Sequence, residues 1–429
     1  MHHLILGAGP AGVIAAETLR KHAPGDRITL VGDEAEPPYS RMAIPYLLVG
    51  DIDERGTYLR KRADHFAQLR IDRLSARAAG VDVQARTVTL EGGVTLAFDR
   101  LLIATGSHPV RPPIPGLDLP GVQTCWTLAD ARAIAARARP GARVLQMGAG
   151  FIGCIIMEAL QKRGVQLSVV EMGDRMVPRM MGAVAGGMIR DWCERQGVQV
   201  FTGHKVERIE RAQGEGGDAL RVHLSGGRVL DADLVISATG VRPAIGFLAG
   251  SGITCLQGVL TDERMQTNVP GIYAAGDCAE AFDPFTRKTV VSAIQPNAAE
   301  QARVAALNML GLPAALAVVT QINVLDTLGL ISTSFGNWQG VPGGEQVALT
   351  DAAAGKHLSL QFEGDRLIGC NSVGMTQHVG AMRGLVEGQV RLGPWKEHLR
   401  RDPTRLMEAY LACAQAQGHW SGAQDARRR

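Results

Sequence analysis

The feature that most constrains this chain is a glycine-rich stretch at its N-terminus. An apolar run, Leu4-Ile5-Leu6, leads into Gly7-Ala8-Gly9-Pro10-Ala11-Gly12, and a helical pattern follows over 13–21. The order predicts a buried strand, a tight turn and a helix. Gly7 permits the sharp exit, Gly9 lets the backbone approach a pyrophosphate, and Gly12 allows close helix packing. Because the helix N-terminus offers free N–H groups to phosphates, the stretch predicts a dinucleotide site, with a turn kept for packing alone as the alternative.

A second copy of this design follows further along the chain. The strand pattern 143–147 leads into Gly148-Ala149-Gly150-Phe151-Ile152-Gly153, a helix to about Arg163, and a strand that ends in Glu171. The acid lies about 20 residues beyond the glycines, which suits a carboxylate that hydrogen-bonds a ribose 2′-hydroxyl. A 2′-phosphate would be repelled there, so NADH is favoured over NADPH, although Arg175 could soften that preference. Two copies predict two dinucleotides and argue against packing alone.

The first copy ends less regularly than the second. Its second strand runs into Gly32-Asp33-Glu34, with the glycine at the usual place of the acid. Asp33 or Glu34 must therefore bind the ribose, and we favour Glu34. Arg41 lies just beyond and is placed to meet a phosphate, with a solvated surface arginine as the alternative.

Further patterns divide the chain into domains. Its 429 residues are too many for one core. Alternation over 81–90 and 94–98 predicts a hairpin, and a proline-rich stretch over 109–115 predicts a stiff linker. A buried strand ends in Ala104-Thr105-Gly106, and a similar one ends in Ala238-Thr239-Gly240.

The C-terminal half continues these patterns. A further buried strand delivers Gly276-Asp277 to an expected helix start, where the carboxylate can accept from a sugar alcohol, and another helix opens near Asn297. Strand patterns and two helical segments after 320 predict a separate antiparallel sheet with helices. The expected domains are 1–112 and 242–319 for the first nucleotide, 113–241 for the second, and 320–429.

Composition excludes several classes of protein. A net charge of +3 is too small to argue for nucleic acid, and no apolar run reaches the roughly 18 residues of a membrane span. The apolar N-terminus is the first strand and helix rather than a signal peptide, so we expect a cytoplasmic protein. The seven cysteines are scattered without C-x-x-C spacing, which predicts neither a metal site nor a disulfide framework.

The order of these motifs resembles the two-dinucleotide flavoprotein reductases, also called pyridine nucleotide-disulfide oxidoreductases. The resemblance rests on both glycine turns, both Ala-Thr-Gly strands and Gly276-Asp277, and it covers essentially the whole chain. It implies an α/β fold with two Rossmann-like domains, the first for FAD and the second for NADH, and a C-terminal α+β interface domain. It also implies that Asp277 binds the ribityl chain and that Ala78 gives main-chain contacts to adenine. Tyr39-Ser40-Arg41 and the region 328–331 look most like rubredoxin and ferredoxin reductases and the flavin domain of assimilatory nitrite reductase.

Departures from the family pattern bear on the chemistry. Met42 stands where many members carry a redox cysteine, so no sulfur relay is expected. The family often has a lysine and a glutamate near flavin N5, but here Pro45-Tyr46 and Ile155 stand in those regions, and Glu158, one helical turn on, could reach the same face.

The resemblance implies hydride transfer from nicotinamide to flavin by stacking and distance alone. Phe151 resembles the family's aromatic lid over the flavin, with plain packing as the alternative, and the helix starting near Asn297 should direct its N-terminus at flavin N1 and C2=O. We expect an NADH-dependent reductase that passes electrons to a ferredoxin-like or rubredoxin-like protein, a reductase subunit or a small acceptor. The alternatives are a signalling flavoprotein similar to apoptosis-inducing factor, or an NADH oxidase. A homodimer is left open.

Overall fold

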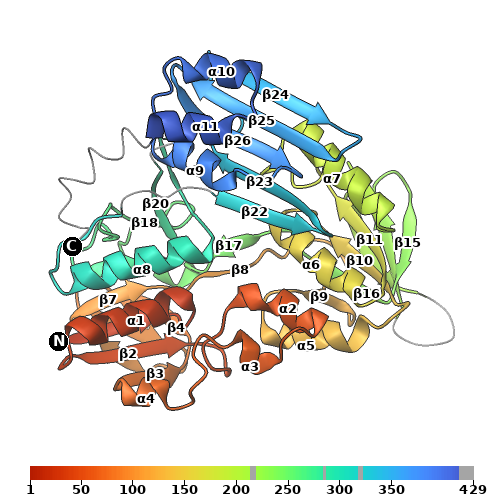
Figure 1. The fold of residues 1–429 in the computed structure, drawn as a ribbon. Helices are drawn as coiled ribbons and strands as arrows, with labels where there is room; N and C mark the ends of the chain where they lie inside the picture. The colour runs from red at the N-terminus through yellow and green to blue at the C-terminus, as the bar shows by residue number, and fades with distance from the viewer. Residues whose placement is uncertain (213–218, 284–286, 317–321, 415–429) are drawn as a thin grey trace. The chain divides into compact units, whose positions relative to one another are not determined.

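The computed structural model describes residues 1–212, 219–283, 287–316 and 322–414 (Figure 1). The chain forms two compact units. The first comprises residues 1–110, 126–128 and 241–319, and the second comprises 111–125, 129–240 and 320–429. Each unit contains one parallel five-stranded sheet, which is the core of the predicted α/β fold.

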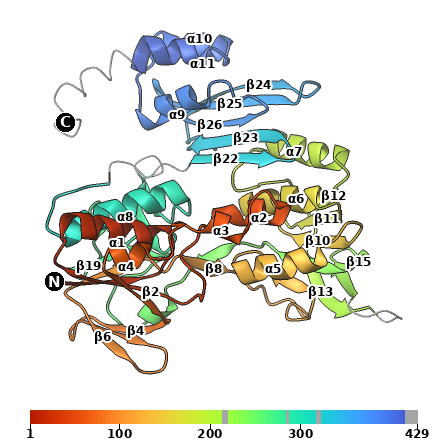
Figure 2. The same ribbon diagram turned by 60° about the horizontal axis from the view of Figure 1, so that its bottom comes forward.

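The parallel sheet of the first unit has the strand order β19-β7-β1-β2-β3. Its strands are β1 (His2–Leu6), β2 (Arg27–Gly32), β3 (Ile71–Ser75), β7 (Arg100–Ile103) and β19 (Ile272–Ala274). Helix α1 (Pro10–His22) contacts β1 and β2, α8 (Gln295–Met309) contacts β7 and β19, and the two helices pack together (Figures 1 and 2). Leu4 and Ile5 point to opposite faces of the sheet and both are fully buried, as is Leu102, so both faces are covered, which is typical of a parallel sheet.

Small sheets and short helices complete this unit. Two of the sheets are antiparallel: β4 (Ala78–Asp82) with β5 (Thr87–Leu90) and β6 (Thr95–Ala97), and β8 (Ser107–Pro109) with β17 (Val241–Pro243). The third is mixed, because β20 (Ala279–Asp283) pairs in parallel with β18 (Val259–Leu260) and antiparallel with β21 (Lys288–Val290). The helices are α2 (Ile44–Val49), α3 (Glu54–Thr57) and α4 (His65–Gln68), with 3₁₀ turns at Arg41–Ala43 and Gly246–Leu248.

The structure corrects two predictions in this unit. The predicted hairpin is present as β5 and β6, but the run 81–90 is not one strand. It is divided between β4 and β5, because Asp82 accepts the N–H groups of Gln84 and Ala85 and Arg86 takes a left-handed φ of 54°. These features turn the chain inside the alternating run. Asp277 does not begin a helix, because Gly276 has φ 81° and accepts the N–H of Ala279, which turns the chain directly into β20.

The second unit repeats the parallel sheet, with the order β12-β11-β10-β16-β9. Its strands are β9 (Val122–Thr124), β10 (Arg143–Met147), β11 (Gln166–Glu171), β12 (Gln199–Thr202) and β16 (Leu234–Ser237). The accompanying helices are α5 (Leu128–Arg137), α6 (Phe151–Lys162) and α7 (Ala183–Arg195), and β13 (Val206–Arg211), β14 (Leu220–Leu224) and β15 (Val229–Ala232) form a small sheet. Strand β10 lies between β11 and β16 as β1 lies between β2 and β7, so both glycine turns leave a central strand.

The C-terminal part of the second unit is an antiparallel sheet with helices, as predicted. Its order is β22-β23-β26-β25-β24. The strands are β22 (Ile322–Thr327), β23 (Leu330–Gly336), β24 (Glu345–Asp351), β25 (Lys356–Glu363) and β26 (Arg366–Val373). Helix α9 (Val379–Glu387) packs on β23 and β26, and α10 (Trp395–Arg401), α11 (Leu406–Ala409) and a π-turn at Tyr410–Ala414 follow. Residues on the other sheet face, Asn371 among them, meet the loop before α7.

Candidate functional site

In the first glycine turn, two glycines pack against the backbone and the third faces open space. A Cβ on Gly7 would lie 2.0 Å from the Ala104 carbonyl oxygen, and a Cβ on Gly12 would lie 1.8 Å from the Gly7 oxygen. A Cβ on Gly9 would meet no atom within 4 Å. Helix α1 starts at Pro10 without a side-chain cap on its N-terminus. The turn therefore presents open space and helix N–H groups, which fits the pyrophosphate of a dinucleotide.

The second turn reproduces this arrangement atom by atom. A Cβ on Gly148 would lie 2.5 Å from the Ala238 oxygen, one on Gly153 would lie 2.5 Å from the Gly148 oxygen, and Gly150 is open. Helix α6 also starts without a side-chain cap, with the half-buried Phe151 and Ile152 as its first residues. In each unit the first glycine thus packs on the alanine of an Ala-Thr-Gly sequence, so the two sets of motifs are structurally linked.

The Glu171 carboxylate lies beside the second glycine turn. Its Oε2 accepts the Ala149 N–H at 2.8 Å, and its Oε1 accepts the Gly173 N–H at 2.7 Å. Two backbone donors therefore hold this carboxylate beside the glycine turn. Arg175 is engaged elsewhere, because its Nε donates to the Met181 oxygen at 2.9 Å and its Nη1 pairs with Asp174 at 2.7 Å. The arrangement opposes a 2′-phosphate on the nucleotide.

The acidic end of the first site is more crowded than the sequence suggested. Glu34 accepts from Arg41 Nη2 at 2.5 Å and from the Tyr39 hydroxyl. Arg41 also donates to the Tyr39 hydroxyl and to the Trp126 oxygen, both at 2.8 Å, and its guanidinium lies over both rings. Asp33 pairs with Arg77 at 2.9 Å. Arg41 is therefore held beside Glu34, and its predicted contact with a phosphate stays a prediction.

The Gly276-Asp277 turn places polar groups beside this first site. Asp277 Oδ2 accepts from the Ser107 hydroxyl at 2.9 Å, and burial raises the pKa of the Asp277 carboxyl. The Gly276 N–H donates to Gln301 Oε1 at 2.8 Å. Gln301 Nε2 is buried and has no partner among the residues described by the structure. A buried donor without a partner is costly, so this amide fits an oxygen-bearing ligand.

The remaining predicted residues lie at or near these features. Ala78 is half-buried and begins β4, and Gly106 and Gly240 take left-handed φ values of 68° and 112°. Thr105 Oγ1 donates to the Ala244 oxygen, and Asn297, near the start of α8, donates to Ser292 Oγ at 2.6 Å.

Glu158 on α6 pairs with Lys162 at 2.8 Å. The sequence analysis missed Ser107, Trp126 and Gln301. Only Ser107, directly after an Ala-Thr-Gly motif, carried a signal.

None of the seven cysteines offers a thiolate. None forms a disulfide, and six are buried. Burial raises the pKa of all seven thiols, and to about 12 for Cys125 and Cys193. Met42, at the family's cysteine position, is 50% exposed. No cluster that could hold a metal and no helix long and apolar enough to cross a membrane occurs in the described part of the chain.

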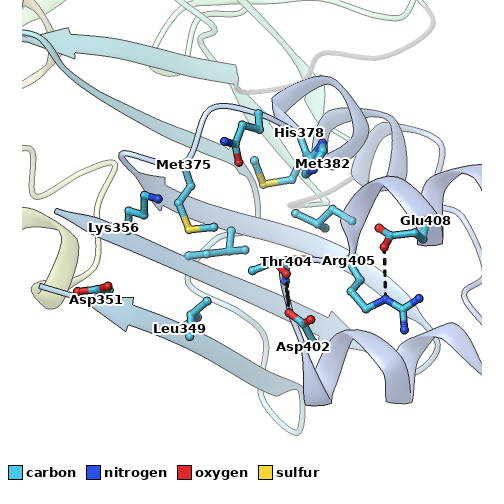
Figure 3. A pocket seen from close by; sticks show the side chains of 13 residues that line it. Leu349, Asp351, Lys356, Met375, His378, Met382, Asp402, Thr404, Arg405 and Glu408 are labelled. Carbon is cyan, nitrogen blue, oxygen red and sulfur yellow. Dashed lines mark hydrogen bonds and ion pairs between the residues drawn. The ribbon is translucent and has the colours of Figure 1, made fainter. Parts of the chain in front are cut away.

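A separate pocket of about 650 Å³ lies in the C-terminal part of the second unit (Figure 3). Leu358 and Met382 contribute buried apolar walls, and Lys356, Asp402 and Arg405 contribute charges. None of the predicted cofactor residues lines it.

The two open glycine turns, each at the start of a helix, are typical of the two-dinucleotide reductases, and comparison with known proteins agrees. The family model described as pyridine nucleotide-disulphide oxidoreductase matches residues 1–306. The epsilon subunit of NADH-dependent phenylglyoxylate dehydrogenase from Aromatoleum evansii is 32% identical over 94% of this chain and 95% of its own. The ferredoxin–NAD(+) reductase component of the biphenyl dioxygenase system of Paraburkholderia xenovorans is 35% identical over 64% of this chain and 66% of its own. The structure of an NAD-dependent persulfide reductase from A. fulgidus is 27% identical, with a TM-score of 0.84 over 92% of this chain and 78% of that one.

The chain therefore belongs to the pyridine nucleotide-disulphide oxidoreductase family. It is an oxidoreductase that uses FAD and NADH, and the predicted fold class and cofactors are confirmed.

Proposed function

We propose that this protein is the NADH-oxidising component of an electron-transfer system and delivers electrons to a separate redox protein without using a cysteine. The observation that carries the proposal is the combination of two open glycine turns with seven thiols whose pKa values burial raises. Bound FAD supplies the capacity to take a hydride from NADH and to release electrons to an acceptor. Because no thiolate is available to relay them, the electrons leave without passing through sulfur.

The residues that hold the two cofactors are proposed from the geometry above. The Gly9 opening and the α1 N-terminus bind the FAD pyrophosphate, and Glu34 and Asp277 bind its sugar alcohols. The Gly150 opening and the α6 N-terminus bind the NADH pyrophosphate, and Glu171 binds its ribose. Ala78 and Arg41 remain proposed FAD contacts, and Phe151, Glu158 and Asn297 remain the proposed catalytic residues.

The acceptor we favour is a small iron–sulfur protein or a partner subunit. The relatives support this choice, because one is a subunit of an NADH-dependent dehydrogenase and another is named as a ferredoxin–NAD(+) reductase. We also propose the domain division 1–112 and 242–319, 113–241, and 320–429, and a cytoplasmic location.

An anaerobic experiment tests this function. Purified flavin-loaded protein is mixed with NADH in a stopped-flow instrument, and the reduced protein is then offered a ferredoxin, a rubredoxin, a disulfide and oxygen in turn. We expect fast bleaching of the flavin and an iron–sulfur protein as the fastest acceptor. A persistent charge-transfer complex would favour a signalling role instead, and oxygen as the fastest acceptor would favour an oxidase.

A further inference from the structure

The loop that follows Glu171 is fastened to the second glycine turn. The Val177 N–H donates to the Ala149 oxygen at 2.9 Å, and the Gly173 N–H donates to Glu171 Oε1 at 2.7 Å. Glu171 in turn accepts the Ala149 N–H at 2.8 Å. Both polar groups of the Ala149 backbone are thus held by this loop and the strand before it. Ala149 lies between Gly148 and Gly150, where the pyrophosphate of NADH is proposed to bind.

The loop has a conformation that its own residues do not favour. Val177 has φ 50°, which is a left-handed value that a β-branched residue rarely adopts. It is 1% exposed, and its carbonyl accepts the N–H groups of Met180 and Met181 at 2.9 and 3.0 Å. Such a conformation persists only when the surrounding structure imposes it.

The far end of the loop is held by the C-terminal sheet. Asn371, on β26, is 3% exposed. Its Oδ1 accepts the Gly182 N–H at 2.9 Å, and its Nδ2 donates to the Met180 oxygen at 2.9 Å. Gly182 is the N-cap of α7 and provides no side-chain cap of its own. One amide therefore satisfies a donor and an acceptor of the loop, which a carboxylate or an apolar side chain cannot do.

We infer that Asn371 is a positioning residue for NADH. Its amide fixes the end of the loop at Met180 and Gly182, the loop holds Val177 in its left-handed conformation, and the Val177 N–H fixes the Ala149 peptide at the nucleotide turn. This role rests on the proposed function, because it requires NADH to bind at the Gly148–Gly153 turn. It gives the C-terminal sheet a part in nucleotide affinity although none of its side chains is a proposed ligand.

The test compares nucleotide affinity in variants of the flavin-loaded protein. Asn371→Leu removes both hydrogen bonds at similar volume, and Asn371→Asp keeps an acceptor for Gly182 but loses the donor to Met180. We expect the Kd for NAD⁺, measured by calorimetry, to rise about tenfold in Asn371→Leu and less in Asn371→Asp, since each lost bond has a modest effect. Flavin content and the limiting rate of flavin reduction at saturating NADH should stay within about twofold, because the chemistry itself is not altered.

A neighbouring residue provides the matched control. Ser372 is also fully buried on β26, and its hydroxyl hydrogen-bonds Thr333 at 2.6 Å, away from the loop. Ser372→Ala should lower the melting temperature but leave the Kd for NAD⁺ unchanged. An unchanged Kd in Asn371→Leu and Asn371→Asp, or an equal rise in Ser372→Ala, would overturn the positioning role. Gly150→Val tests the nucleotide site separately from the role of Asn371. NAD⁺ binding that survives this change would refute the proposed site at the Gly148–Gly153 turn, and the role of Asn371 with it.

Discussion

The Glu171 carboxylate illustrates how one residue can both shape a site and select its ligand. Two backbone N–H groups hold it, so its charge is fixed beside the place where the adenosine ribose of NADH is proposed to bind. Each oxygen retains a lone pair that can accept from a ribose hydroxyl. A 2′-phosphate would meet this charge directly, which gives a physical reason for a preference for NADH.

Replacing Glu171 should therefore weaken the preference for NADH. We expect Glu171→Ala to lower the NADH-to-NADPH ratio of kcat/KM. The change should correspond to about 1 to 3 kcal/mol in transition-state free energy, the scale of a charge-assisted hydrogen bond. Steady-state kinetics with both nucleotides measures the ratio. Glu171→Gln is the control, because it removes the charge but keeps an oxygen acceptor, and it should separate repulsion from positioning. An unchanged ratio in both variants would exclude Glu171 from nucleotide selection.

Arg175 offers a second prediction at the same scale. Its guanidinium is tied to Asp174 and to the Met181 oxygen, although Asp174 itself is 73% exposed. Asp174→Ala should free the Nη1 side of the guanidinium and remove a negative charge, so the KM for NADPH should fall by about twofold to tenfold while that for NADH changes little. The double variant Asp174→Ala with Arg175→Ala is the control. A similar fall in the double variant would show that Arg175 has no part in the effect.

Single residues also mark the limit of sequence reasoning in this chain. Glu171 could be predicted from spacing alone, because strand, turn and helix lengths fix where the second strand ends. The contacts of Arg41 could not be predicted in this way, because one of its acceptors is the oxygen of Trp126, a residue distant in sequence. Spacing carries no information on such a contact. For the same reason Gln301, whose Oε1 accepts the Gly276 N–H, gave no signal in the sequence.

At the scale of elements, strand-turn-helix units were predictable where the apolar pattern and the glycines agreed. Helices α1, α6 and α8 and strands β1, β2, β7, β10, β11, β16 and β19 lie where the sequence predicted them, whereas β3, β9 and β12 were not predicted. The errors at 81–90 and at Asp277 arose where the chain turns through a left-handed residue, Arg86 in one case and Gly276 in the other. An arginine gives no warning of such a turn, and a glycine before an aspartate suits a turn as well as a helix start.

The first glycine turn leads to a prediction about a whole element. A Cβ at Gly9 meets nothing within 4 Å, so Gly9→Val should fold, yet its side chain would occupy the opening in front of α1. We expect purified Gly9→Val to be colourless, with the flavin absorbance lost and the far-ultraviolet circular dichroism retained. Gly25→Val, also in open space but beyond the other end of α1, is the matched control and should stay yellow. Full flavin content in Gly9→Val would place the FAD pyrophosphate elsewhere.

At the scale of the whole molecule, the thiols decide how many electrons the reduced protein can store. A member of this family with a redox-active disulfide takes up electrons at sulfur as well as at flavin. Here burial raises the pKa of every thiol, and Met42 cannot form a thiolate at all. Anaerobic titration with dithionite should therefore end at about two electrons per FAD rather than four, without a long-wavelength thiolate-to-flavin band.

A mutation of Cys255 tests the same point, because Cys255 is half-buried whereas the other six cysteines are buried. Cys255→Ser should leave NADH-to-ferricyanide turnover within about twofold of the parent, and alkylation of the parent with iodoacetamide should have equally little effect, because a neutral thiol plays no part in electron flow. Disulfide substrates should be reduced poorly by both proteins. Four-electron uptake, or efficient disulfide reduction that Cys255→Ser abolishes, would show that sulfur does carry electrons in this molecule and would contradict the proposed function.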